Sequence, residues 1–267
     1  MSKHADRPIG IFDSGVGGLT VVSQIIRAMP NENIVYFGDC ARAPYGDRTP
    51  EQLAHFSRQI IDFLTSKNIK ALVVACGTIS ARIFDAVLTM TDVPTIGMVA
   101  PAVEAVLDAT VSGKMAVLAT AGTIASRAHQ TAINAQMPDA VVAGISCPLF
   151  VPLVEEGWTD GQVPFLVAQK YLAPLKDSGI DTVLLGCTHY PLLADSIASA
   201  APPDTKIIDP AFALAENLKT RLAAQGLLRA KTTQPAFQFY ISGRKEKFEE
   251  IAARVLGHEF EANVVKF

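Results

Sequence analysis

The chain has 267 residues, of which 49% are hydrophobic and 18% are charged, and its formal net charge is −3. This length and apolar content supply a sizeable core, which excludes a disordered chain, and the slightly acidic balance argues against a nucleic-acid surface. The beginning, MSKHADRPIG, lacks the apolar stretch of a signal peptide, and no uncharged apolar run reaches membrane-spanning length. We therefore expect a soluble, cytoplasmic protein with neither nucleic acid nor membrane as a partner.

Short apolar runs alternate along the chain with longer amphipathic stretches. Runs without polar alternation are typical of strands that are buried on both faces, and hence parallel. One intervening helix has a clear start, with Thr49 as its cap, Pro50 in its first turn and Gln52 completing a capping box. This alternation predicts an α/β fold in which helices cover parallel sheets. The expected strands lie at residues 9–12, 34–37, 71–75, 115–119, 140–145 and 182–186.

An internal repeat divides the chain. Residues 69–76 align with residues 180–187, so that Cys76 matches Cys187 at an offset of 111 residues. A second pair of segments, 12–15 and 119–122, matches at an offset of 107 residues. The repeat predicts one α/β unit that occurs twice, as two similar lobes. It also places each cysteine at the carboxyl end of a strand, where open α/β sheets bind their ligands, so that the thiols face each other if the lobes do.

The four cysteines are scattered and form no CxxC pair, which favours free thiols over a disulfide scaffold. A single buried cysteine is usually a small core residue, but Cys76 and Cys187 each precede a helical stretch. The positive end of a helix dipole lowers the pKa of a thiol and favours the thiolate. His189 follows closely, and it fits either an acid–base role or a local hydrogen-bond network.

Three further segments are candidates for the site. Asp13 opens a glycine-rich segment that fits a helix cap or a carboxylate-binding loop of backbone N–H groups, and this segment lacks the GxGxxG pattern. The loop 38–48 has the composition of a turn, yet its length and chemistry indicate ligand contact. Glu155 fits a solvated helix end. The five histidines show no metal-ligand spacing, so we expect no metal.

Two thiols that flank one ligand from opposite lobes suit inversion at a carbon that bears hydrogen. One thiolate removes a proton from one face, the other thiol delivers a proton to the opposite face, and the roles exchange in the reverse reaction. Asp13 near one thiol and His189 near the other would tune their pKa values.

Five motifs together resemble the cofactor-independent aspartate/glutamate racemase superfamily, and the resemblance covers nearly the whole chain. It implies interconversion of L- and D-glutamate without pyridoxal phosphate or another cofactor, which supplies D-glutamate for peptidoglycan. It also implies that Cys76 and Cys187 are the proton donor and acceptor, that Asp13 and His189 assist them, and that Glu155 helps. The motifs are IGIFDSGVGGLTV from Ile9, YFGDCARAPYGDR from Tyr36, VVACGT from Val73, PLFVPLVEEG from Pro148 and LGCTHYPLL from Leu185.

The resemblance further implies two flavodoxin-like lobes related by a pseudo-two-fold axis, with the site in the cleft between them. Residues 1–98 and 210–267 would form the first lobe and residues 99–209 the second. In the family, Cys-Asn-Thr is usual where this chain has Cys76-Gly77-Thr78, so a polar side chain that contacts substrate is missing here. The implied substrate contacts are Asp13, Ser14, Tyr45, Gly46, Gly77, Thr78, Thr188 and His189.

Two alternatives stay open. A racemase for aspartate or another small amino acid fits equally well, because a hydroxyl-rich lining does not select the length of the substrate side chain. A two-lobed amino-acid-binding protein without catalysis also fits the fold, although the cysteine pair speaks against it. We expect a homodimer, since homo-oligomers are common among soluble enzymes.

Overall fold

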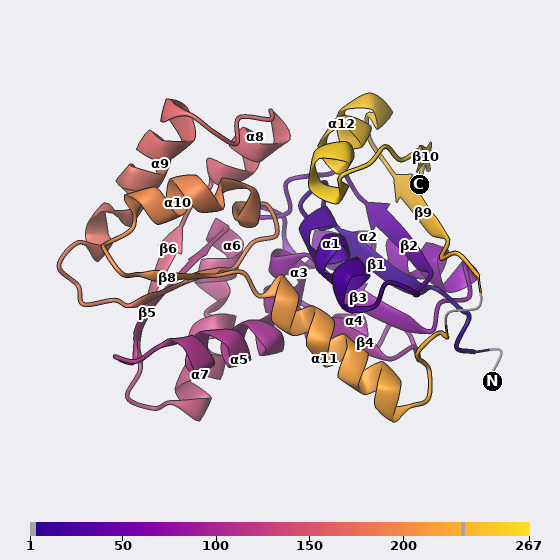
Figure 1. Ribbon diagram of the computed structural model, residues 1–267, viewed down its shortest axis with the longest axis horizontal. Helices are drawn as coiled ribbons and strands as arrows, with labels where there is room; N and C mark the ends of the chain where they lie inside the picture. Colours follow the sequence, from indigo (N-terminus) through magenta and orange to yellow (C-terminus); the bar gives the residue numbers. More distant parts are fainter. Residues whose placement is uncertain (1–3, 231–232) are drawn as a thin grey trace.

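The computed structural model describes residues 4–230 and 233–267, which form two parallel sheets covered by helices and arranged side by side as two lobes (Figure 1). The first sheet has the spatial order β10 (Ala262–Val264), β9 (Phe237–Ile241), β2 (Ile34–Gly38), β1 (Ile9–Asp13), β3 (Ala71–Val74) and β4 (Thr95–Gly97). The second sheet has the order β6 (Val141–Ser146), β5 (Lys114–Ala119), β7 (Thr182–Leu185) and β8 (Lys206–Ile208). The predicted α/β class with two similar lobes is therefore confirmed.

Helices cover both faces of each sheet and connect the strands. Those of the first lobe are α1 (Leu19–Ala28), α2 (Pro50–Ser66), α3 (Gly77–Arg82), α4 (Phe84–Leu88) and α12 (Lys245–Leu256). Those of the second are α5 (Val99–Ala109), α6 (Ala121–Ser126), α7 (Ala128–Gln136), α8 (Phe150–Glu155), α9 (Gln162–Leu172) and α10 (Ala194–Ala200), with short 3-10 turns at Ala173–Leu175 and Tyr190–Leu193. Helix α11 (Ala211–Ala224) packs against both α1 and α5 (Figure 1).

The predicted start of α2 is confirmed in detail. The Thr49 hydroxyl accepts a hydrogen bond from the backbone N–H of Gln52 at 3.3 Å, and the Gln52 side chain accepts one from the backbone N–H of Thr49 at 3.1 Å. Pro50 occupies the first turn, where its missing N–H leaves no helical hydrogen bond unmade.

The internal repeat is visible in the strand order, since β2-β1-β3-β4 corresponds to β6-β5-β7-β8. Both read 2-1-3-4, the order of flavodoxin-like sheets. The backbone N–H of Ala75 donates to Phe12 O at 2.9 Å, and that of Gly186 donates to Leu118 O at 2.8 Å. These bonds support the offset of 111 for the cysteines. They give 106, not 107, for the first strands, so the alignment of Phe12 with Ala119 was wrong by one residue.

One predicted strand differs in burial, and four others were not predicted. Strand β6 was expected to be buried on both faces, but its residues are exposed or half-buried because it forms the outer edge of the second sheet. The strands that sequence reasoning missed are β4, β8, β9 and β10, three of which have only three residues. No helix in the described ranges combines the length and apolar content needed to cross a membrane.

The chain passes between the sheets twice, once after β4 and once after β8. Helix α11 and strands β9 and β10 then return to the side of the first sheet, to which both strands belong. We propose lobe boundaries at these two crossings, which divides the chain into residues 1–98 with 210–267 and residues 99–209.

Candidate functional site

A small pocket lies where the carboxyl ends of the central strands of the two sheets meet. Cys76 follows β3 and Cys187 follows β7, and both thiols line this pocket from opposite lobes. Seven of the eight predicted contact residues line it as well; Asp13 does not. The lining consists of Ser14, Pro44, Tyr45, Gly46, Cys76, Gly77, Thr78, Thr120, Val151, Cys187, Thr188 and His189.

Cys76 stands at the amino end of α3 and is almost fully buried. Burial raises the pKa of the Cys76 thiol well above its usual range, and the nearby carboxylate of Asp13 raises it further. Backbone N–H groups of Ile79 and Thr78 act in the opposite direction but are outweighed. The expected lowering of this pKa by the helix dipole was therefore wrong, because desolvation of the thiolate dominates. Cys76 is held as a neutral thiol.

Cys187 lies in a different electrostatic setting. Its Sγ is 3.8 Å from Nδ1 of His189, and Nε2 of the same ring is 2.8 Å from Oε1 of Glu155. Burial of the ring lowers the pKa of His189, but its hydrogen bonds to Cys187 and Glu155 together raise that pKa well above the usual value. The structure thus places a protonated imidazole between a carboxylate and a sulfur, and it brings the predicted His189 and Glu155 together.

Asp13 is fully buried behind the pocket lining. Its carboxylate accepts hydrogen bonds from the backbone N–H groups of Gly15 at 3.2 Å and Gly18 at 2.9 Å, and from the Thr188 hydroxyl at 3.2 Å. The expectation that this loop binds a ligand carboxylate was therefore wrong for these two N–H groups, because Asp13 itself occupies them. Burial raises the pKa of Asp13, although His189 and the backbone bonds oppose the shift. Asp13 links the first lobe to Thr188 of the second.

The loop 38–48 is fixed by a buried acid that sequence reasoning did not single out. Asp39 accepts hydrogen bonds from the Tyr45 hydroxyl, from Nε of Arg42 at 2.6 Å and from the Ser242 hydroxyl at 2.6 Å. This network holds Tyr45 and Gly46 against the pocket, as the prediction of ligand contact for this loop requires. Its position directly after the second strand was the available signal.

Thr120 is a second lining residue that was not predicted. Its hydroxyl lies 3.1 Å from that of Thr78 across the two lobes and 3.0 Å from that of Thr123. With the corrected offset of 106 residues, Thr120 is the counterpart of Ser14 in the first lobe. The internal repeat was thus the signal that could have found it.

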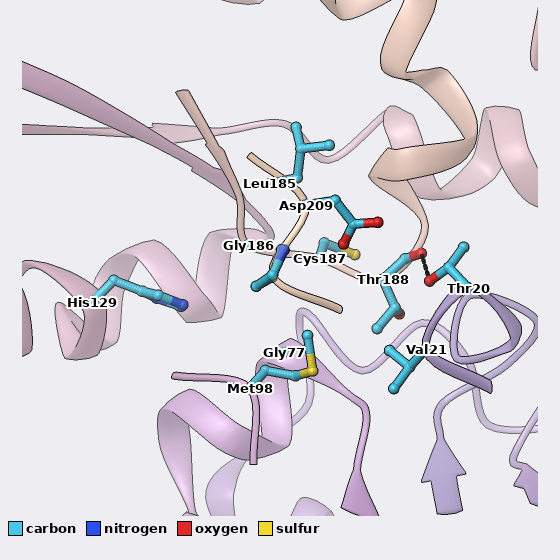
Figure 2. Close-up of a pocket in the computed structure, with 11 residues that line it drawn as sticks. Thr20, Val21, Gly77, Met98, His129, Leu185, Gly186, Cys187, Thr188 and Asp209 are labelled. Carbon is cyan, nitrogen blue, oxygen red and sulfur yellow. Dashed lines mark hydrogen bonds between the residues drawn. The ribbon is translucent and has the colours of Figure 1, made fainter. Parts of the chain in front are cut away.

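A second cavity lies on the other side of Cys187 (Figure 2). Gly77, Cys187 and Thr188 line both cavities and separate them. The rear cavity is also lined by Met98 and Asp209, which belong to the two chain crossings between the lobes. Each cavity has about 10 Å³ of free volume, room for about one water molecule. The lobes are therefore closed around the two sulfurs. Within residues 4–230 and 233–267, no group of three or more His, Cys, Asp or Glu side chains could hold a metal ion.

These features define a two-lobed α/β enzyme in which strand ends of both lobes present ionisable groups to one closed pocket. The sequence matches the model of the Asp/Glu/Hydantoin racemase family over residues 9–218. The chain belongs to this family and is an isomerase, an amino-acid racemase.

Curated and solved relatives are similar over nearly their whole length. The glutamate racemase of Geobacter metallireducens is 43% identical over 251 residues, which cover 94% of this chain and 93% of the relative. The crystal structure of glutamate racemase isoform RacE1 from Bacillus anthracis superposes with a TM-score of 0.94 at 38% identity and covers 99% of both chains. That of glutamate racemase from Francisella tularensis in complex with D-glutamate gives a TM-score of 0.91 at 37% identity, with 98% of both chains covered.

Proposed function

We propose that this racemase interconverts L- and D-glutamate by a two-cysteine, cofactor-independent proton transfer at Cα, and that it supplies D-glutamate for peptidoglycan. The observation that carries this proposal is the pair of thiols, Cys76 and Cys187, which line one closed pocket from opposite lobes. The names of the relatives support the substrate, and one of them was solved with D-glutamate in place.

In one direction, the Cys187 thiolate beside protonated His189 removes the Cα proton of the substrate. The C–H electron pair passes into the α-carboxylate, which leaves a planar carbanion. The Cys76 thiol then donates its proton to the opposite face of Cα, and the product has the inverted configuration. The closed pocket excludes bulk water, which would otherwise compete to reprotonate the carbanion.

In the reverse direction the two sulfurs exchange roles. Cys76, as a thiolate, is a strong base because burial and the Asp13 carboxylate raise its pKa. Cys187 is then the donor, and Glu155 keeps the His189 ring oriented toward it through the 2.8 Å bond. Asp13 and His189 thus serve different sulfurs, with Glu155 acting through His189.

The remaining lining positions the substrate. Hydroxyl groups are available on both lobes for the polar groups of an amino acid, while Gly46 and Gly77 can offer only backbone atoms. Hydroxyl-bearing residues at the pocket are Ser14, Tyr45, Thr78, Thr120 and Thr188. We further propose that the protein works as a cytoplasmic homodimer, which sedimentation of the purified protein tests.

Incubation of the pure protein with L-glutamate in deuterated water tests the proposed reaction. We expect D-glutamate to form with deuterium at Cα, in dialysed protein and without added cofactor or metal. A parallel incubation with L-aspartate tests the substrate, since faster turnover of aspartate would overturn the choice of glutamate. Absence of both deuterium and the D-isomer would instead favour a binding protein.

A further inference from the structure

Two glycines stand where the backbones of the two lobes come closest. Gly77 opens α3, and a methyl group placed on its Cα would lie 2.4 Å from the carbonyl oxygen of Gly186 in the second lobe; both glycines are seen in Figure 2. Gly122, in the first turn of α6, stands in the same relation to the Gly46 carbonyl of the first lobe, at 2.5 Å. Side-chain carbons essentially never approach other atoms within 3.0 Å.

Both contacts border the reacting groups. Gly77 directly follows Cys76 and separates the pocket from the rear cavity, while Gly46 lies in the pocket lining beside Tyr45. Between the two contacts, α3 packs against α6, and the hydroxyls of Thr78 and Thr120 meet across the lobes at 3.1 Å. The two glycines therefore determine how closely the lobes approach at the pocket itself.

Local backbone conformation does not require glycine at either position. Neither Gly77 nor Gly122 has a positive φ, and both lie in helices, where alanine is the better residue. Each contact is with a backbone oxygen, which cannot rotate away as the end of a side chain can. What glycine provides at these positions is the close approach of the opposite lobe.

We propose that Gly77 and Gly122 are positioning residues for racemisation, whose missing side chains let the lobes close until both sulfurs reach one substrate. This inference rests on the proposed two-thiol reaction. To regain an ordinary contact of 3.4 Å, an alanine at Gly77 must displace the lobes by about 1 Å. A misplacement of that size can reduce turnover by about 10²-fold.

The test compares Gly77→Ala and Gly122→Ala with Gly144→Ala as a matched control. A methyl group at Gly144 in β6 would also be crowded, at 2.6 Å, but its neighbour is Nε2 at the flexible end of Gln130 in the same lobe. We expect kcat for L-glutamate to fall about 10²-fold in the two seam variants, with a change in KM below tenfold and an unchanged or raised Tm. The control should stay within about threefold of the parent protein.

A second readout does not depend on catalysis. The rate at which iodoacetamide alkylates Cys76 reports the opening of the pocket, and Cys147, a buried thiol of the second lobe, serves as reference in the same sample. We expect faster alkylation of Cys76 relative to Cys147 in both seam variants, and no change in the control. If the parent protein does not racemise glutamate, the proposed function fails, while this measurement still decides the role of the glycines.

Three results would overturn the inference. These are turnover in both seam variants within threefold of the parent protein, a loss of activity that follows a drop in Tm of several degrees, or unchanged alkylation of Cys76.

Discussion

The two sides of the pocket share a backbone plan and differ in chemistry. Cys76 and Cys187 follow equivalent strands of two sheets with the same 2-1-3-4 order, so the fold alone accounts for two opposed thiols. Their polar neighbours are not equivalent. Cys187 has His189 at 3.8 Å with Glu155 behind it, whereas Cys76 is buried near the carboxylate of Asp13. Pseudo-symmetry places the sulfurs, and the unequal partners decide which of them is charged.

This difference has a consequence for the resting protein. The protonated ring of His189 compensates negative charge on the Cys187 sulfur, while nothing positive lies among the groups that affect Cys76. The free protein is therefore prepared for proton abstraction by Cys187, and the opposite direction requires the proton to be redistributed first.

The largest expected effect comes from removing either sulfur. Cys76→Ser and Cys187→Ser should each lower kcat by about 10²–10⁴-fold in both directions, the range that a positioned acid or base contributes, because a serine hydroxyl is a far weaker acid at neutral pH than a thiol. Polarimetry with L- and D-glutamate measures both directions. Cys147→Ser is the control, since that thiol only donates to the carbonyl of Ile145. Near-normal turnover in either of the first two variants would contradict the two-thiol reaction.

The partners of the two sulfurs should affect the two directions unequally. His189→Asn removes the cation beside Cys187, and Asp13→Asn removes the anion near Cys76. We expect each variant to lower kcat by about 10²-fold in the direction in which its own sulfur is the base, and by less in the other. Initial rates from each enantiomer measure this. If both variants slow the same direction, the assignment of one partner to each sulfur is wrong.

The sequence predicted the parts of this comparison that depend on strong local signals. Continuous apolar runs identified six strands, and the repeated cysteines identified the two lobes, because a buried parallel strand leaves a recognisable pattern. Strands β4, β8 and β10 have three residues each, too short for such a pattern. The helix dipole at Cys76 was a correct local argument, but burial, which only the folded structure shows, reversed its effect on the pKa.

The polar contacts around the pocket were less predictable. The side chain of Asp13 turns back onto the N–H groups of Gly15 and Gly18, and a sequence cannot distinguish this from an open anion-binding loop. Glu155 was assigned to the site by family resemblance alone, since 34 residues separate it from His189. Contacts of this kind depend on how the lobes meet, which local propensity does not encode.

A smaller effect is expected from Glu155→Gln, which keeps the shape of the side chain and removes its charge. His189 loses one of the two groups that raise its pKa, so its proton is lost at a lower pH than in the parent protein. We expect a tenfold or smaller loss of kcat at neutral pH. The alkaline limb of the kcat profile, where the imidazolium is lost, should move toward lower pH.

The same substitution should change the pH dependence of stability. Because folding raises the pKa of His189, the stabilisation from its protonated form is complete below the unfolded value near 6.5 and disappears as the pH rises through the folded value. Denaturant unfolding of parent and variant should therefore differ most at acid and neutral pH and converge at alkaline pH. An unmoved alkaline limb together with parallel stability curves would show that Glu155 does not act through His189.

The smallest effect is expected where a residue serves neither sulfur in particular. Tyr45→Phe removes one of three donors to the buried Asp39 carboxylate and leaves Arg42 and Ser242 in place, so the loop keeps most of its anchorage. The loss of one hydrogen bond to a charged group corresponds to about 1.5–3 kcal/mol of stability, which denaturant unfolding measures. KM for L- and D-glutamate should rise by a similar small factor. Since Tyr45 contributes to the pocket without pairing with either thiol, a rise for one enantiomer alone would place it on one side of the asymmetry.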